Sequence, residues 1–355
     1  MSGTSLDGID AVLADFGNTP WQLREHVYRP YPDDLRGRLL RLHRPEANEL
    51  HEALLVANAL TRCYAAVVAE LLNQAGVKAQ EVNAVGCHGQ TVRHAPQRGY
   101  TLQLCNGALL AELTTITVVC DFRSRDIAAA GQGAPLVPAF HAILTRRPHI
   151  HRVIVNIGGI ANLTNLPAEA PASGFDSGPG NMLLDAWCQK HTGQRYDADG
   201  AWALSGQIIP ELLQRLLTHP FFGESPPKSS GREQFNLQWL DGFLTGKETP
   251  QDVQATLLTL TVQSITKAVQ KYCQGVQEIY FCGGGARNKA LVEKLQEALR
   301  GVKTDVTDAL GINAQTLEAY AFAWLAWQTL EGKPGNLPQA TGARGLRVLG
   351  AIYKK

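Results

Sequence analysis

The residues best suited to chemistry in this sequence lie in short glycine-rich stretches. The chain opens on MSGTSLDGID, in which Gly3, Thr4, Ser5 and Gly8 form a small, hydroxyl-rich turn. The backbone N–H groups of such a turn can close on a phosphate. The stretch lacks the lysine of a P-loop and does not match G-x-G-x-x-G, so neither the Walker nor the Rossmann motif applies.

Two further glycine turns lie later in the chain. NIGGIANLT contains Gly158 and Gly159, and CGGGARN contains Gly283, Gly284 and Gly285 between a strand and a helix start. One such turn is usually only a tight turn that needs a positive φ. Three in one α/β chain favour a nucleotide, because two turns could hold a polyphosphate while the triple glycine lets a purine lie against backbone. Tight turns without a ligand remain the alternative.

A candidate general base is Asp176, in GFDSGPGNMLLD. The Gly-Pro-Gly turn after it predicts a helix that starts near Asn181, and Asp176 could simply cap that helix. A carboxylate beside a helix N-terminus is also stabilised as the anion, as a general base must be. The competing carboxylate is Asp185, which at a helical position is expected to face solvent or to cap a neighbour.

The acidic residues of the first turn are candidates for a magnesium site. Asp7 and Asp10 flank the loop and could order Mg²⁺ through water, since Mg²⁺ keeps much of its hydration shell when it binds with a nucleotide. Turn formation by Asp7 is the equal alternative.

A second polar stretch, CHGQTVRH, follows a strand directly. Cys87, His88 and His94 do not have the spacing of a zinc site. At the end of a strand, His88, Gln90 and Thr91 are better partners for the hydroxyl groups of a ligand.

Further candidates for substrate contacts carry charge. DFRSRD is expected to place Arg123 and Arg125 on one side of an extended segment, where one could hold a carboxylate in a fork geometry. A surface pair with Asp121 or Asp126 is the alternative. Glu318 interrupts the apolar face of TLEAYAFAWLAW, and it could contact substrate or be a partnered polar group of the core.

Helical and strand patterns alternate along the chain. Residues 51–76 and 254–275 have helical spacing, and residues 151–166 predict a hairpin around a Gly-Gly turn. The other predicted elements are a strand over 82–91, a strand, an Asn-started helix and a strand over 100–122, a strand over 278–285, a helix over 288–301, a strand over 302–308 and a helix over 314–332. The pattern predicts an α/β protein of two domains.

Composition limits the class of protein. The chain has 355 residues, 45% of them hydrophobic and 18% charged, and its formal net charge of +1 offers no concentrated basic face for nucleic acid or a membrane surface. We find no apolar run of about 18 residues, so no membrane span is expected. Seven cysteines without C-x-x-C pairs predict reduced core thiols and a cytoplasmic location: Cys63, Cys87, Cys105, Cys120, Cys188, Cys273 and Cys282.

The sequence resembles one known family over its whole length. The matching segments, in order, are SGTSLDGID, CHGQTVRH, DFRSRDIAAAGQGAPLVPAFH, NIGGIANLT, FDSGPGN and CGGGARN. They look like those of anhydro-N-acetylmuramic acid kinase. The resemblance implies an α/β fold of two actin/hexokinase-like, ribonuclease H-type domains around an ATP cleft. It also implies a bacterial enzyme of cell-wall recycling that hydrolyses a 1,6-anhydro ring and phosphorylates the freed O6.

The resemblance also implies site residues. Asp176 matches the catalytic base. The sugar hydroxyls are the groups that His88, Gln90 and Thr91 would contact, and its lactyl carboxylate is the group that Arg123 or Arg125 would hold. ATP, with Mg²⁺, would contact residues from three segments: Gly3, Thr4, Ser5, Leu6, Asp7, Gly8, Ile9, Asp10, Gly158, Gly159, Gly283, Gly284 and Gly285. The expected domains are 1–127, with 325–355 packed on it, and 128–324.

Several expectations stay open beside the resemblance. Family members carry a strand directly before the first loop. We therefore expect the natural chain to begin upstream of residue 1. The expected partners are ATP and an amino sugar, without nucleic acid or membrane, and a homodimer is an open expectation. The alternatives are an ordinary sugar kinase of the same fold, and a sugar or nucleotide sensor without catalysis.

Overall fold

The computed structural model describes residues 1–3 and 6–355, so the predictions for Thr4 and Ser5 lie outside the described residues. The chain forms two compact units: Met1–Phe140 with Thr316–Lys355 is unit 1, and His141–Gln315 is unit 2. The boundary expected at 127/128 falls inside unit 1, and the one expected at 324/325 falls inside a helix of unit 1. The division into functional domains stays a prediction.

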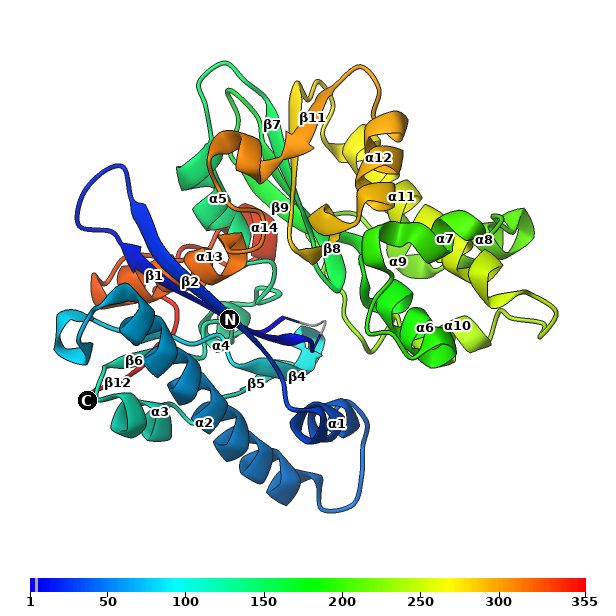
Figure 1. The fold of residues 1–355 in the computed structure, drawn as a ribbon. Coiled ribbons are helices and arrows are strands. Elements are labelled where there is room, and N and C mark those ends of the chain that lie inside the picture. The colour runs from blue at the N-terminus through cyan, green and yellow to red at the C-terminus, as the bar shows by residue number, and fades with distance from the viewer. Residues whose placement is uncertain (4–5) are drawn as a thin grey trace. The chain divides into compact units, whose positions relative to one another are not determined.

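Unit 2 is built on one five-stranded sheet (Figure 1). Its order is β11-β10-β7-β8-β9, in which β7, β8 and β9 are antiparallel neighbours while β10 and β11 run parallel to β7. An antiparallel meander joined to two parallel strands is the ribonuclease H-type arrangement that the sequence predicts. The strands are β7 (Arg152–Ile157), β8 (Ile160–Leu166), β9 (Ser173–Pro179), β10 (Glu278–Cys282) and β11 (Lys303–Val306).

Burial explains why this sheet forms. Every residue of β7 is buried, as expected for a central strand that is covered on both faces. The long helix α11 (Pro250–Tyr272) packs against β9 and α12 (Lys289–Ala298), and fourteen of its residues are buried. The other helical segments of unit 2 are α6 (Met182–Thr192), η3 (Ala198–Gly200), α7 (Ala201–Ser205), α8 (Pro210–Leu216), α9 (Pro220–Gly223), α10 (Leu237–Asp241), η4 (Gly284–Arg287) and η5 (Thr307–Leu310); α5 (Val137–Thr145) crosses the unit boundary.

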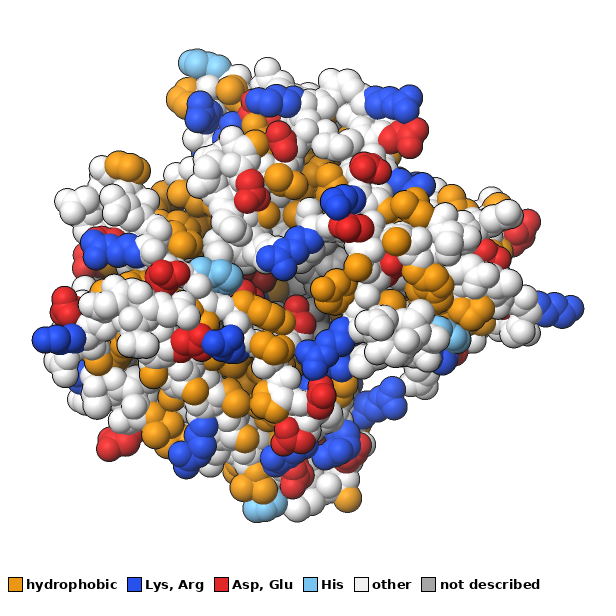
Figure 2. Space-filling model, in the orientation of Figure 1, with side chains coloured by type: hydrophobic (Ala, Val, Ile, Leu, Met, Phe, Trp, Pro, Cys, Tyr) orange, Lys and Arg blue, Asp and Glu red, His pale blue; other side chains and the backbone are white. Residues whose placement is uncertain are grey.

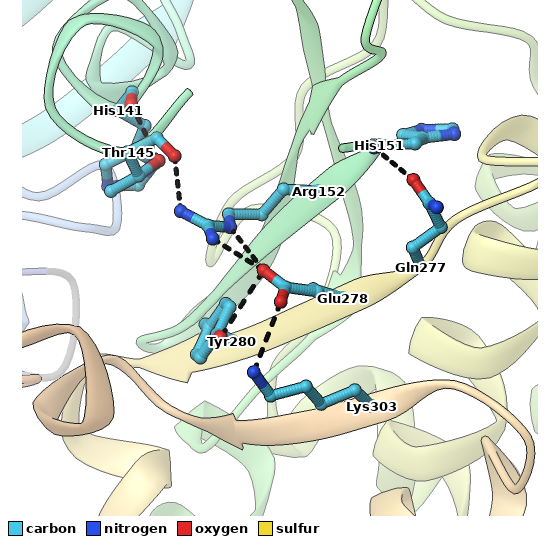
Figure 3. A network of polar contacts seen from close by, with 8 residues as sticks. All are labelled: His141, Thr145, His151, Arg152, Gln277, Glu278, Tyr280 and Lys303. Atoms are coloured by element: carbon cyan, nitrogen blue, oxygen red, sulfur yellow. Dashed lines mark hydrogen bonds and ion pairs between the residues drawn. The ribbon is translucent and has the colours of Figure 1, made fainter. Parts of the chain in front are cut away.

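A charged network ties together the starts of the parallel strands (Figure 3). The Arg152 guanidinium donates to Glu278 Oε2 at 3.0 and 2.5 Å and to the Thr145 carbonyl at 2.5 Å. Lys303 Nζ donates to the other oxygen of Glu278 at 3.2 Å. Burial raises the pKa of Glu278, but the bonds from Arg152 and Lys303 outweigh it and leave the pKa lowered. Ion pairs therefore stabilise the end of the sheet where the parallel strands begin. The glycine turns lie at the opposite end, where these strands finish.

The described strands of unit 1 form three separate sheets. β1 (Gly8–Asp15) pairs antiparallel with β2 (Gln22–Pro30), whereas β3 (Val85–Gly86) pairs with β6 (Val118–Cys120), which pairs with β12 (Ala351–Tyr353). β4 (Gln90–Ala95) and β5 (Tyr100–Leu104) form a hairpin. The helical segments are α1 (Asp33–Arg41), α2 (Glu49–Ala75), η1 (Ala79–Glu81), η2 (Pro96–Arg98), α3 (Gly107–Thr114), α4 (Ser124–Ala128), α13 (Leu317–Leu330) and α14 (Pro338–Thr341).

A cavity of about 510 Å³ is lined by both β1 and β3. Apolar residues of α2 and α13, among them Leu71 and Trp327, also line it. Met1 lies at its edge: its ammonium donates to the Asp10 carbonyl at 2.6 Å, and its carbonyl accepts from Asp10 N–H at 2.9 Å. The chain start is thus paired with β1 in the manner of an antiparallel strand.

Helix α2 departs from one expectation. Within the described residues it is the single helix long and apolar enough to cross a membrane by length and composition, with a mean hydropathy of 1.4 over 18 residues. No such segment is expected from the sequence. The reason for the apolar character is packing, because Val56, Leu60 and Tyr64 are buried in the core of unit 1. All seven cysteines are free thiols. Figure 2 shows basic and acidic side chains interspersed over the face drawn.

Most predicted elements are confirmed. The helix expected to stop at Gly76 ends there in a left-handed cap, and the helix after Asn106 is capped by the Asn106 side chain. The prediction of an extended segment over DFRSRD is wrong, because Ser124–Ala128 form the short helix α4. The strands β1, β2 and β9 are not predicted by the sequence pattern.

Candidate functional site

In unit 2, two glycine-rich turns meet at the carboxyl ends of the parallel strands. The turn between β7 and β8 consists of Gly158 and Gly159, whose carbonyls accept from Asn181 N–H at 2.8 Å and Gly180 N–H at 2.9 Å. A Cβ on Gly180 would lie 2.3 Å from the Gly158 carbonyl oxygen. Glycine is required there by close backbone approach, and the turn is packed directly on the start of α6.

The triple glycine lies beside the same strand end. Gly283 has φ +79°, and a Cβ there would lie 2.4 Å from Asn156 Oδ1. A Cβ on Gly285 would lie 2.4 Å from Ile157 Cγ2, whereas Gly284 has more space. These contacts bring the segments NIGG and GGG together in one unit. Carboxyl ends of parallel strands are where α/β proteins usually bind ligands.

Asp176 lies on β9, toward the same end of the sheet. Its side chain is buried, and Oδ2 accepts a hydrogen bond from Ser230 N–H at 2.8 Å. Its own N–H donates to the Lys228 carbonyl at 3.1 Å. An N–H bond to a carboxylate favours the charged form, which is the form a base needs.

The structure corrects the alternative reading of Asp176. The residue at the N-cap of α6 is Asn181, and Asp176 belongs to the preceding strand, so the interpretation of Asp176 as the cap of this helix is wrong. Asp185 lies in the first turn of α6 and is half-buried.

In unit 1, the described residues beside Thr4 and Ser5 are held from several sides. Leu6 is fully buried at φ +58°, its N–H donates to the Gly3 carbonyl, and its carbonyl accepts from Arg36 Nε at 2.9 Å. Gly8 belongs to β1, where a Cβ would lie 2.3 Å from the Arg29 carbonyl. Its glycine requirement therefore comes from packing against β2. Ile9 is a buried core residue.

The two acidic residues of this loop differ in their surroundings. Asp7 is exposed, and its Oδ1 accepts from Gly8 N–H at 2.9 Å, as the turn-forming interpretation requires. Asp10 Oδ1 lies 3.0 Å from His26 Nε2 on the neighbouring strand. The described residues contain no group of three or more potential metal ligands.

His88 connects this loop to the arginine stretch. Its Nδ1 lies 3.2 Å from the Ser2 carbonyl, and its Nε2 lies 3.1 and 2.9 Å from Nε and Nη2 of Arg123. Burial, and secondarily the Arg123 charge, lowers the pKa of His88 well below its ordinary value. The neutral ring then donates from Nδ1 and accepts at Nε2. Both ring nitrogens have protein partners, so His88 positions the loop.

Gln90 is also buried and also holds the loop. Its Nε2 donates to the Gly3 carbonyl at 3.1 Å, and its Oε1 accepts from Tyr31 O–H at 3.1 Å. Thr91 is half-buried, and its hydroxyl accepts from Gln103 Nε2 at 3.3 Å.

Arg123 is half-buried beside His88. Besides His88 it donates to the Gly133 carbonyl at 2.7 Å. Asp126 is fully buried and accepts from Gly133 N–H, Asn336 Nδ2 and Thr341 Oγ1, each at 2.8 Å. That carboxylate fixes the loop after Arg123 to the C-terminal part of the chain.

The remaining expected residues are less informative. Asp121 accepts from Ser124 Oγ, Arg125 is exposed, and Glu318 lies half-buried in the first turn of α13.

Sequence reasoning missed two residues that shape these sites. Ser230 holds the Asp176 carboxylate, and Ser2 Oγ bonds Tyr64 Oη at 2.8 Å and the Gly89 carbonyl at 3.0 Å. The small and polar run KSSGR, after two prolines, was the available signal for a loop at Ser230.

Comparison with known proteins gives one consistent result. A family model described as anhydro-N-acetylmuramic acid kinase matches residues 1–355. A relative of that name from Nitrosospira multiformis is 59% identical over 355 residues, which cover 99% of this chain and 97% of the relative. Another from Nitrosomonas europaea is 58% identical over 355 residues, with 99% and 98% covered.

Among solved structures, the chain is similar to an activator of 2-hydroxyisocaproyl-CoA dehydratase from Clostridium difficile with bound ADPNP. The TM-score is 0.39 at 14% identity, with 76% of this chain and 85% of that chain covered.

Proposed function

The chain belongs to the anhydro-N-acetylmuramic acid kinase family, and from this premise we propose which residues carry out its reaction. The protein is an ATP-dependent sugar kinase. It opens 1,6-anhydro-N-acetylmuramic acid with water and phosphorylates O6, giving N-acetylmuramic acid 6-phosphate and ADP, a reaction of peptidoglycan recycling.

Asp176 is the proposed general base. It takes a proton from the water that attacks C1 while the C1–O6 bond breaks, and the released O6 attacks the γ-phosphorus of ATP as ADP leaves. Capture of O6 by the phosphoryl group replaces the general acid of an ordinary glycosidase. The observation that carries this proposal is the buried carboxylate held by Ser230 N–H at 2.8 Å, near the glycine turns of the same unit.

ATP is proposed to contact three backbone segments. Residues 3–10 and the turn of Gly158 and Gly159 would bind phosphates, and residues 283–285 would lie against the adenosine. Close packing at Gly180, Gly283 and Gly285 supports this, because glycine there lets both turns and the start of α6 pack together at one end of the sheet.

Magnesium is proposed to enter with ATP. Asp7, which is exposed, or Asp10, which is half-buried, would contact it through water. Bound Mg²⁺ would neutralise phosphate charge.

The sugar is proposed to contact Arg123, Thr91 and Glu318. His88 and Gln90 are assigned to positioning of the loop, because their polar atoms bond Ser2, Gly3, Tyr31 and Arg123. We also propose a cytoplasmic enzyme that acts without nucleic acid or membrane. A homodimer is an open part of the proposal.

Isotope labelling tests the function. Reaction in ¹⁸O-labelled water, stopped before the product exchanges oxygen by mutarotation, should place the label on C1 of the 6-phosphate and none on the phosphoryl group. A control with unlabelled water and labelled product measures exchange. Phosphorylation without label at C1 would indicate an ordinary sugar kinase, and ligand binding without turnover would indicate a sensor.

A further inference from the structure

A second cavity, which lies in unit 2, has an unusual concentration of positive charge. It measures about 300 Å³ and is lined by residues of β9, α9 and α11, among others. Lys228, Lys267 and Lys271 line it, and none of its lining residues in the described part of the chain is acidic. Glu224 is close enough to influence Lys228 electrostatically, yet it does not line the cavity.

Lys228 is the most unusual of the three. It is only 5% exposed, and its ammonium donates to the Phe221 carbonyl at 2.9 Å and lies 4.3 Å from the centre of the Phe221 ring. An ammonium has three donors, and a buried one is costly unless it is paired. Within the described residues, none of the three lysines forms an ion pair. Burial lowers the pKa of Lys228, and the charge of Lys271 adds to this.

The other two lysines approach from one helix face. Lys267 and Lys271 are four residues apart on α11, where side chains at this spacing are neighbours and like charges repel. Both are exposed at the cavity. Three positive charges around one cavity destabilise each other until an anion lies between them.

We propose that this cavity binds a phosphate dianion, either inorganic phosphate or the phosphate of a small monoester. Lysine binds phosphate as a point charge, and three ammoniums match a dianion better than they match chloride. Leu217 and Phe222 give the cavity apolar surface for a small organic group. Its volume is at the lower end of the range for ligand sites.

The site is connected to Asp176 through backbone. Ser177 lines the cavity directly after Asp176 on β9, and the Lys228 carbonyl accepts the Asp176 N–H. Phosphate held by Lys228 would therefore stabilise the segment that holds Asp176.

Calorimetry tests the proposal with the full chain. The protein is first saturated with a non-hydrolysable ATP analogue, so that the nucleotide loops are occupied. Inorganic phosphate or glycerol 3-phosphate is then titrated at constant ionic strength in chloride. One saturable site is expected, and the double variant Lys267→Ala/Lys271→Ala should bind at least tenfold more weakly. The matched control Lys247→Ala/Lys294→Ala removes the same charge elsewhere in unit 2 and should bind as the wild type does.

The outcomes separate the sources and the alternatives. Tighter binding of glycerol 3-phosphate assigns the site to a monoester, and tighter binding of phosphate assigns it to the inorganic ion. Lys228→Met gives a second variant, which should also lose binding if it folds. Equal affinity in the wild type and the Lys267→Ala/Lys271→Ala variant, or no saturable binding, would overturn the proposal.

Discussion

At the scale of single residues, the position of each candidate site side chain depends on hydrogen-bond partners that are distant in sequence. Ser230 is 54 residues from Asp176, yet its N–H fixes the carboxylate. His88 likewise joins Ser2 to Arg123 through its two ring nitrogens. Because these partners act through backbone groups and neutral rings, residue type alone does not reveal them. The sequence identified Asp176 and the glycine turns but could not predict what holds them.

Acid sensitivity is the first prediction at this scale. His141 is fully buried with its Nδ1 2.8 Å from Thr164 Oγ1, and burial lowers the pKa of His141 to about 3. Its folded-state pKa lies below the unfolded value near 6.5, so the stability it contributes is present above pH 6.5 and is lost as the pH falls toward 3. Between pH 7 and 5 the loss should be about 2 kcal/mol.

Urea unfolding at the two pH values measures this loss. His141→Gln should reduce the difference in unfolding free energy between pH 7 and 5 by about 2 kcal/mol. The exposed His149→Gln is the control and should leave the difference unchanged. An unchanged difference in His141→Gln would show that the buried imidazole does not set the acid sensitivity.

At the scale of elements, strand pairing explains both what was predicted and what was missed. The apolar run of β7 and the helical spacing of α11 are local signals, and both elements are confirmed. β9 reads SGFDSGP, a run of turn-forming residues whose strand conformation comes from pairing with β8. Such pairing is a tertiary effect that composition does not indicate.

The cavity between β1 and β3 gives a prediction at this scale. Met1 already exchanges both backbone hydrogen bonds with Asp10, so an extended segment added before Met1 would continue along β1. A segment of about six residues, in which Val and Ile alternate, added before Met1 should fill the cavity and raise the melting temperature. Each buried side chain contributes about 2 kcal/mol to the free energy of unfolding. A Gly/Ser segment of equal length is the control. Equal melting temperatures would show that the cavity does not accept a strand.

The charged network of Arg152, Glu278 and Lys303 in unit 2 gives a second prediction at the scale of elements (Figure 3). Glu278→Gln leaves the buried Arg152 without its carboxylate, and losing one partner of a buried pair costs about 3–5 kcal/mol. The exposed pair of Glu297 and Arg300 supplies the control, because Glu297→Gln should change stability by less than about 1 kcal/mol. Denaturant unfolding compares the two, and similar small losses would mean that the buried pair contributes little.

At the scale of the whole molecule, the two units differ in how the chain builds them. Unit 2 is one continuous segment with its own core, whereas unit 1 needs Thr316–Lys355 to return to it. Helix α13 packs against β1 and β3, so the first 140 residues alone lack part of their core. The sequence pattern indicated two α/β domains but not this boundary, because no composition change marks it.

Independent folding follows from this difference. A fragment of residues 141–315 should unfold in one cooperative transition, and a fragment of residues 1–140 should not, because it lacks α13. Circular dichroism and urea unfolding measure both. A cooperative 1–140 fragment, or an unfolded 141–315 fragment, would contradict the assignment of the two units.

The most direct test of the account concerns Asp176. Asp176→Asn keeps the size of the side chain and can still accept from Ser230 N–H, but it cannot take a proton from water. Binding of ATP and of the anhydro-sugar, measured by calorimetry, should remain, while kcat falls by about 10²–10⁴. Asp185→Asn is the matched control, with turnover near the wild-type rate. If the folded Asp176→Asn enzyme binds both ligands and still turns over near the wild-type rate, Asp176 is not the base.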